Sequence, residues 1–191
     1  MTSLGYFSLL LALLISVYGL LASILGIRYR RPELSMGGQN AAFVLLGLTS
    51  IASFALIYSF VSQDFGIRYV AENSSIGLPM FYTVAAFWGG QAGSLLLWVW
   101  ILTIFTAIAI RGGRRRLPDF MPYVTTILMG LCSGFLILVN FLSNPFELLS
   151  SPPPDGRGLN PLLQNPGMTF HPPALYLGYV GFSIPYAFAM A

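Results

Sequence analysis

The chain's few charged residues divide it into long charge-free runs. The 191 residues include nine arginines, six acidic residues and no lysine, and the runs between them cover 1–27, 34–63, 73–110, 120–146 and 158–191. Each run exceeds the roughly 20 apolar residues that cross a bilayer as a helix. Backbone groups in hydrocarbon must be satisfied within the segment, which favours helices. We predict an all-α, polytopic membrane helix bundle of about five transmembrane helices, with spans near 4–27, 41–62, 80–110, 121–142 and 173–191.

The composition supports a single membrane domain over residues 1–191. Only 8% of the residues are charged, against about 25% in an ordinary soluble domain, so a soluble enzyme is excluded. No Lys, Arg, Asp or Glu lies within the runs, which disfavours a proton-pumping or ion-coupled transporter. Cys132 is the only cysteine, which excludes a disulfide framework, a CxxC redox pair, a CxxCH haem attachment site and a zinc cluster.

The arginines predict the orientation in the membrane. Seven of them lie between the first and second spans and between the third and fourth, whereas the other loops carry only Arg68 and Arg157. Short loops rich in arginine stay cytoplasmic, so the amino terminus and the segments 63–79 and 143–172 should lie outside, in the periplasm of a bacterium. The arginines are therefore interpreted as a topology signal beside the lipid bilayer, and we predict no nucleic-acid partner.

The outer segment 143–172 is rich in turn-forming residues. It contains Ser151-Pro152-Pro153-Pro154, Asn160-Pro161 and Asn165-Pro166-Gly167, a density of turn and polyproline signals that excludes a helix. Two interpretations remain open for it, a stiff solvated connection and a functional segment.

Small residues recur every four positions in the third predicted span. Ala85, Gly89 and Gly93 would form a flat stripe against which another helix, or less commonly a planar ligand, could pack. Gly130 and Gly134 repeat the spacing and could supply the facing surface. A helix that starts after Pro79 would have about thirty residues, too long for the bilayer alone, and would place Trp88 near the outer headgroups. Trp98 and Trp100 would lie deeper, packed inside the bundle.

His171 is the only histidine and lies at the outer end of the fifth predicted span. Pro172 and Pro173 follow it and can occupy a first helical turn, where a missing N–H costs little. The residue before a proline is biased toward extended backbone, so the imidazole should be held at the helix entrance. A neutral imidazole there could bind iron axially, although a lone interfacial histidine is more often structural.

Three segments resemble a known family in sequence and in order. They are YVAENSS at 69–75 with Leu78-Pro79, WGGQAGSLLLW at 88–98, and a stretch from Asn144-Pro145-Phe146 through GLNPLLQ at 158–164 to HPPALYLGYVGF at 171–182. Together they resemble the CcmF family of cytochrome c maturation haem lyase subunits, which belongs with CcmC and CcsA among haem-handling membrane proteins.

The resemblance implies a role in cytochrome c-type biogenesis. Such a subunit binds haem b, as the substrate haem, at the periplasmic face and presents it for covalent attachment to apocytochrome c, together with other cytochrome c maturation subunits. The family's axial iron ligand corresponds to His171, and Trp88, Pro172, Pro173 and Tyr176 would shape the pocket. Arg157 is a candidate propionate partner, although a solvated loop charge is the favoured interpretation. No catalytic residue is implied.

The chain departs from the family pattern at two points. Many members carry His-Glu where this chain has Gln91-Ala92, so no role of those side chains is transferred. The family's tryptophan-rich segment, second outer histidine and membrane-buried histidines would all follow residue 191. The resemblance therefore implies an amino-terminal fragment with a truncated last helix, inactive without its carboxy-terminal part.

The sequence leaves two interpretations of the function open and also indicates where the protein is located. The resemblance implies a multi-pass protein of a bacterial inner (plasma) membrane, with the mitochondrial inner membrane less favoured. The alternative to a haem-binding subunit is a non-catalytic structural membrane subunit or transporter fragment that binds no haem.

Overall fold

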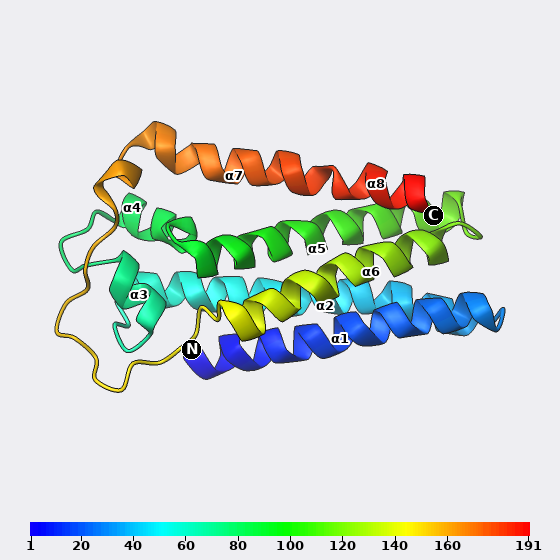
Figure 1. The fold of residues 1–191 in the computed structure, drawn as a ribbon, viewed down its shortest axis with the longest axis horizontal. Coiled ribbons are helices and arrows are strands. Elements are labelled where there is room, and N and C mark those ends of the chain that lie inside the picture. The colour runs from blue at the N-terminus through cyan, green and yellow to red at the C-terminus, as the bar shows by residue number, and fades with distance from the viewer.

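The computed structural model describes residues 1–191, and all of its regular elements are helices. Four of them are long and apolar enough to cross a membrane, and they lie side by side along the long axis of the molecule (Figure 1). They are α1 (Thr2–Arg28), α2 (Pro32–Val61), α5 (Gln91–Arg116) and α6 (Met121–Ile137), the last continued by a π-helical turn (Leu138–Leu142). The predicted all-α membrane bundle is confirmed, although α2 begins nine residues before its predicted span.

The two longest helices pack closely because small residues line their contact. A Cβ atom added to Gly38 of α2 would lie 2.8 Å from the carbonyl oxygen of Gly19 of α1, so only glycine permits this approach. Polar side chains add contacts across the bundle. Ser133 Oγ of α6 donates a hydrogen bond to Ser16 Oγ of α1 at 3.0 Å, and the indole Nε1 of Trp100 donates to Ser50 Oγ of α2 at 2.9 Å.

The two ends of the bundle differ in character (Figure 1). The arginine end carries seven arginines, Arg28, Arg30, Arg31, Arg111, Arg114, Arg115 and Arg116, at the α1–α2 and α5–α6 connections. The opposite end, named the α3 end here, carries α3 (Arg68–Asn73), α4 (Met80–Ala85) and the loop 143–165. This separation agrees with the predicted two-sided distribution of charge; the placement of the α3 end outside the membrane stays a prediction.

The third predicted span is not one helix. Residues 80–110 form α4, a 3₁₀ turn (Ala86–Trp88) and α5, with a break at Gly89-Gly90. Because the helix is interrupted, Ala85, Gly89 and Gly93 do not form one stripe. A Cβ on Gly89 would meet the side chain of Leu159, and one on Gly93 would meet the carbonyl of Phe87 and the ring of Tyr69. The predicted stripe is therefore wrong.

The proposed facing surface on α6 is absent as well. A Cβ on Gly130 would meet only Leu20 of α1, at 3.8 Å, and one on Gly134 would have no neighbour within 4 Å. Trp98 and Trp100 pack inside the bundle as predicted. The ring centroid of Trp98 lies 5.5 Å from that of Phe135 and 5.4 Å from that of Tyr176, and Trp100 lies 5.3 Å from Phe54.

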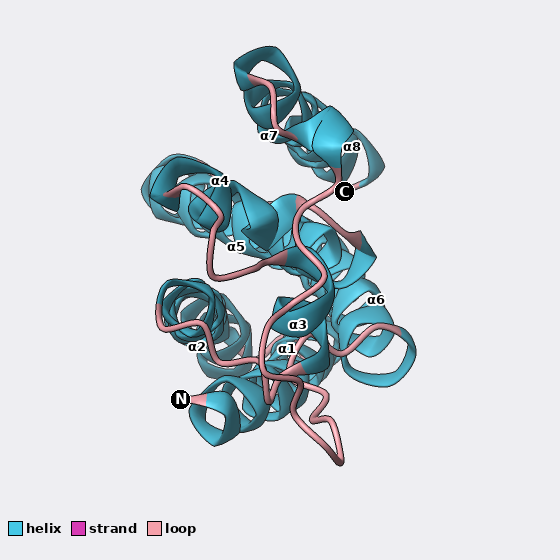
Figure 2. Ribbon diagram, turned by 90° about the vertical axis from the view of Figure 1, so that its left-hand side faces the viewer, coloured by secondary structure: helices cyan, strands magenta, loops and turns pink.

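The fifth predicted span consists of two helices, α7 (Pro166–Gly181) and α8 (Ser183–Met190). They follow one another along α5 and α6 from the α3 end toward the arginine end (Figure 1), on the side of α5 that faces away from α2 (Figure 2). The helix begins at Pro166 instead of 173, so the expectation that 143–172 excludes a helix is wrong for its last seven residues. Neither helix alone reaches the roughly 20 residues of a span; that the two together cross the membrane stays a prediction.

The loop 143–165 is held against α3 by backbone hydrogen bonds. The Leu149 N–H donates to the Gly66 carbonyl at 2.9 Å, and the Arg157 N–H donates to the Ala71 carbonyl at 2.7 Å. The Asp155 carboxylate accepts a hydrogen bond from the Ile76 N–H at 2.8 Å. The loop thus forms a fixed cover over the α3 end, which favours the stiff connection among the two interpretations.

Candidate functional site

The helix that carries His171 begins at a capped entrance. The side chain of Asn165 accepts a hydrogen bond from the Gly167 N–H at 2.9 Å, and Pro166 occupies the first helical position. Asparagine at the cap and proline directly after it are both favoured at a helix start, because the first N–H groups have no partner within the helix. This local signal explains why the helix starts before the histidine.

The two prolines after His171 lie inside α7 and not in its first turn. A proline in a helix interior has no N–H to donate to the carbonyl four residues earlier. Pro173 therefore leaves the carbonyl of Thr169 without its helical partner. The indole Nε1 of Trp88 donates a hydrogen bond to that carbonyl at 3.0 Å, so Trp88 replaces the missing backbone donor.

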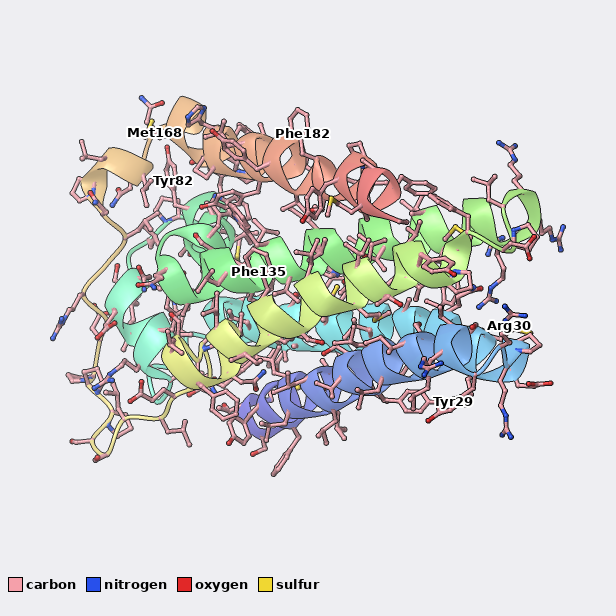
Figure 3. The ribbon with its side chains drawn as sticks, turned by 45° about the vertical axis from the view of Figure 1, so that its right-hand side comes forward. Tyr29, Arg30, Tyr82, Phe135, Met168 and Phe182 are labelled. Atoms are coloured by element: carbon pink, nitrogen blue, oxygen red, sulfur yellow. The ribbon has the colours of Figure 1, made fainter.

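Tyr176 makes a second attachment between α7 and α5. Its hydroxyl donates to Ser94 Oγ at 3.2 Å, and Ser94 Oγ donates to the Trp88 carbonyl at 3.0 Å. The Tyr176 ring packs edge-on against Trp98, which in turn contacts Phe135 of α6. In Figure 3, Phe135 lies on α6 beside α5, and Met168 and Phe182 mark the two ends of α7. Tyr176 thus fixes the middle of the helix as Trp88 fixes its beginning.

His171 lies on the outer side of this fixed helix. Its side chain is exposed and makes no hydrogen bond. Ala174 and Gly178 follow at helical spacing on the same face and are exposed too. A Cβ on Gly178 would have no neighbour within 4 Å. The imidazole is therefore available to a ligand, above a part of the helix surface with small side chains.

The other predicted site residues act from the opposite side of α7. Trp88 and Tyr176 are half-buried between α7 and α5 and do not surround the imidazole, whereas Pro172 and Pro173 are half-buried in the helix itself. Arg157 has an exposed side chain without an ion pair, in line with the favoured interpretation of a solvated charge. The structure links Trp88 to the carbonyl that Pro173 leaves free, that of Thr169, two residues before His171, which the sequence did not indicate.

Tyr69 supports Trp88 from α3 and was also missed. Its hydroxyl accepts a hydrogen bond from the Gly90 N–H at 2.9 Å and donates to the Phe87 carbonyl at 3.1 Å. Burial raises the pKa of this hydroxyl well above its ordinary value, so it remains protonated and able to donate. The sequence feature that indicates this contact is the glycine pair Gly89-Gly90. A Cβ on Gly90 would lie 2.9 Å from the Tyr69 ring, so the close approach of Tyr69 requires glycine there.

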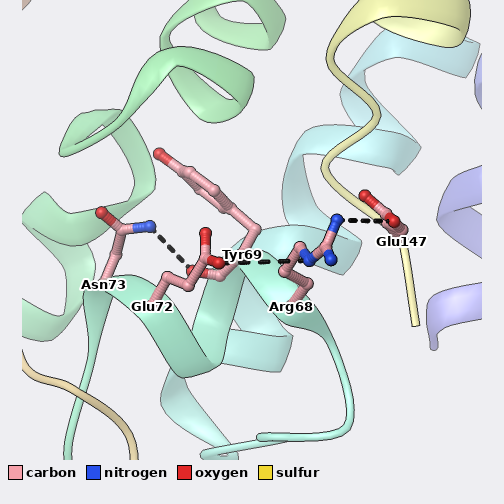
Figure 4. A network of polar contacts seen from close by, with 5 residues as sticks. All are labelled: Arg68, Tyr69, Glu72, Asn73 and Glu147. Atoms are coloured by element: carbon pink, nitrogen blue, oxygen red, sulfur yellow. Dashed lines mark hydrogen bonds and ion pairs between the residues drawn. The ribbon is translucent and has the colours of Figure 1, made fainter. Parts of the chain in front are cut away.

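A polar cavity of about 360 Å³ lies beside Tyr69. Figure 4 shows polar contacts among the residues that line the cavity. Arg68 forms ion pairs with Glu147 at 2.7 Å and with Glu72 at 4.0 Å. The side chain of Asn73 donates a hydrogen bond to the Tyr69 carbonyl at 2.9 Å. The Arg68 and Glu147 side chains are about half exposed, so solvent screens their pairing. The cavity thus lies between α3, the start of α5 and the first residues of the loop 143–165.

Comparison with known proteins identifies the class to which this fold and site belong. The family model described as cytochrome c assembly protein matches residues 88–191, which include Trp88 and the whole of α7. The chain belongs to the cytochrome c assembly protein family.

Similarity to individual proteins places the chain within this family more specifically. The chain is 45% identical over 186 residues to "Cytochrome c-type biogenesis protein CcmF" of Escherichia coli, covering 95% of this chain and 28% of the relative. It is 42% identical over 188 residues to "Cytochrome c-type biogenesis protein ccl1" of Rhodobacter capsulatus, covering 98% of this chain and 29% of the relative. A solved structure, "Cytochrome c Heme Lyase CcmF", superposes with a TM-score of 0.85 at 29% identity over 97% of this chain and 29% of that one.

These similarities confirm the predicted resemblance to the CcmF family. The chain spans less than a third of the length of the relatives it matches. Four apolar helices and bacterial relatives together identify a multi-pass protein of the bacterial inner membrane.

Proposed function

We propose that this chain binds haem through His171 and presents it, at the α3 end of the bundle, for covalent attachment to apocytochrome c. One observation carries the proposal. The only histidine of the chain is exposed and free of hydrogen bonds on a helix whose entrance is held from behind by Trp88. An imidazole held in this way can bind iron without first giving up a protein contact.

The surroundings of His171 suit a flat, apolar ligand. Ala174 and Gly178 keep the helix surface low beside it, and Phe170 and Tyr179 are large exposed side chains on the same helix. A porphyrin has two broad apolar faces, so small residues that allow close approach and aromatic side chains that shield its edge both favour binding. Haem b, the form without covalent links to protein, is the substrate that such an open site would hold.

Haem supplies the iron and the vinyl groups, and the chain positions them. His171 would hold the iron, and the attachment of α7 to the 3₁₀ turn through Trp88 and to α5 through Tyr176 would hold the porphyrin in one orientation. A chain with one histidine supplies one such ligand. The second ligand would come from the carboxy-terminal part found in the longer relatives, and the CxxCH thiols of apocytochrome c would add to the haem vinyl groups. Other cytochrome c maturation subunits would deliver haem and apocytochrome.

A chimera tests the proposal. The chain would replace the matching amino-terminal part of the Escherichia coli relative in a strain that lacks its own copy, and holocytochrome c would be measured by its covalently bound haem. We expect His171→Gly to abolish maturation in the functional chimera. Leu177→Gly, which removes an exposed side chain from the same helix, would keep it. Normal maturation with His171→Gly would favour the alternative, a structural subunit that binds no haem.

A further inference from the structure

The arginines at the arginine end have no acidic partners. Both ion pairs of the structure involve Arg68, at the α3 end. None of the seven arginines at the arginine end is therefore paired with a carboxylate, although Glu33 in the first turn of α2 and Asp119 in the α5–α6 connection lie at the same end. Arg28 and Arg31 are simply exposed. Arg114 is different, because neighbouring side chains hold its guanidinium in a fixed position.

Arg114 is oriented by neutral groups of α2. Its Nε donates to Gln39 Oε1 at 2.7 Å and its Nη2 donates to Asn40 Oδ1 at 2.7 Å. Gln39 is buried, with 4% of its surface exposed. The guanidinium also lies over the ring of Phe43, 5.5 Å from the centroid, a geometry that stabilises a cation without neutralising it. The full positive charge therefore remains, and Nη1 has no partner in the chain.

This oriented charge lines a cavity with two further arginines. Phe43, Arg111, Arg114 and Arg115 surround a space of about 520 Å³ between α2 and α5. Beside the cavity, toward the middle of α2 and α5, the surface of the two helices is apolar. Ile108, one turn below Arg111, is 61% exposed, and a Cβ added to Gly47, one turn below Phe43, would have no neighbour within 4 Å. A basic cavity thus opens onto an apolar, uncovered strip between two membrane helices.

We propose that this cavity binds the headgroup phosphate of an anionic phospholipid, with an acyl chain along the strip at Gly47 and Ile108. Arginine recognises phosphate through parallel N–H donors, and basic sites between membrane helices bind anionic headgroups. A soluble phosphate would use the arginines but not the apolar strip. The predicted topology accounts for the seven arginines, but it does not require the Gln39 and Asn40 contacts that orient Arg114. The site is independent of haem binding at the α3 end.

Native mass spectrometry of the purified chain in detergent tests this proposal. The probes are phosphatidylglycerol, phosphatidylcholine and sn-glycerol 3-phosphate at equal concentrations. The test variant is Arg111→Gln/Arg115→Gln, and the matched control is Arg28→Gln/Arg31→Gln, which removes the same charge from the same end outside the cavity. Helix content from circular dichroism shows that each variant folds. A further single variant, Arg114→Lys, keeps the charge but loses the parallel N–H donors of the guanidinium.

The expected result is one phosphatidylglycerol bound preferentially over phosphatidylcholine. Arg111→Gln/Arg115→Gln should weaken it about thirtyfold, since each arginine near an anionic surface contributes roughly a factor of five, and the control pair should change it less than threefold. Equal losses in the two double variants would mean attraction to general charge and would overturn the proposal. Equal binding of both lipids, or binding of sn-glycerol 3-phosphate as tight as that of phosphatidylglycerol, would overturn it as well.

Discussion

The indole Nε1 of Trp88 donates a hydrogen bond to the backbone carbonyl of Thr169, two residues before His171. That carbonyl is free because residue 173 is a proline. A side chain 81 positions earlier in the chain thus completes the helix that carries the histidine. We therefore propose that Trp88 is a positioning residue for His171, acting through the helix backbone.

Replacing Trp88 with phenylalanine should destabilise the chain by about 1–3 kcal/mol, because the half-buried Thr169 carbonyl loses its donor. Pro173→Ala restores an N–H at the position that would normally serve this carbonyl. We therefore expect Pro173→Ala to recover part of the loss in a Trp88→Phe background. Thermal unfolding of the two single variants and the double variant measures this coupling, and strictly additive effects would show that the two residues do not serve the same carbonyl.

The Tyr176–Ser94 hydrogen bond should contribute about 0.5–1.5 kcal/mol to the free energy of unfolding. Tyr176→Phe should lose most of this. Ser94→Ala should lose more, because it also removes the bond to the Trp88 carbonyl, and the double variant should lose little more than Ser94→Ala alone. Hydrogen exchange in α7 should rise in all three variants, since the middle of the helix loses an attachment. Unchanged exchange in α7 would contradict the role of this contact in fixing the helix.

Two glycines provide a matched pair. Gly93→Ala should be strongly destabilising, because its Cβ would overlap the Phe87 carbonyl and lie 2.8 Å from the Tyr69 ring. Gly134→Ala places a Cβ where no atom lies within 4 Å and should stabilise α6 by roughly 0.5–1 kcal/mol, as alanine does in a helix interior. Expression level and unfolding temperature in detergent measure both. A tolerated Gly93→Ala would mean that the break between Trp88 and Gln91 is not as close-packed as the structure has it.

The buried hydroxyl of Tyr69 should make the stability of the folded chain depend on pH in the alkaline range. Burial raises its pKa in the folded chain, whereas the unfolded chain has the ordinary tyrosine value of about 10. Ionisation above that value therefore favours the unfolded state, so the Tyr69 contribution is complete below about pH 10 and falls as the pH rises further. Tyr69→Phe should lower stability at neutral pH and flatten this alkaline decline. A decline as steep as that of the wild type would assign it to other groups.

Much of the fold could be predicted from local sequence properties. Runs without charge and with high hydropathy predict α1, α2, α5 and α6 because insertion into a bilayer depends on the segment itself. The arginine distribution likewise predicts two different ends. The break at Gly89-Gly90 could not be located in this way, because the apolar run continues through it and the Tyr69 hydroxyl that stabilises it comes from another helix.

A contact with a distant part of the chain also explains why the sequence did not predict where α7 begins. Local rules place Pro172 and Pro173 at a helix start, since prolines inside a helix leave carbonyls unpaired. Trp88 removes that cost for Thr169 by a tertiary contact, and the helix begins at Pro166 instead. The uniqueness of His171 and the family resemblance predict it as a haem ligand, whereas its exposure on a helix that Trp88 holds from the other side is visible only in the structure.

The most direct test of haem binding at His171 is chemical rescue. The chain would be purified with haem as His171→Gly, and its absorption spectrum and haem content measured before and after addition of imidazole. We predict that the variant loses the wild-type spectrum and haem content and regains them with imidazole, which can occupy the vacated position, while Leu177→Gly retains both throughout. A His171→Gly chain that holds haem with an unchanged spectrum before imidazole is added would contradict axial ligation by His171.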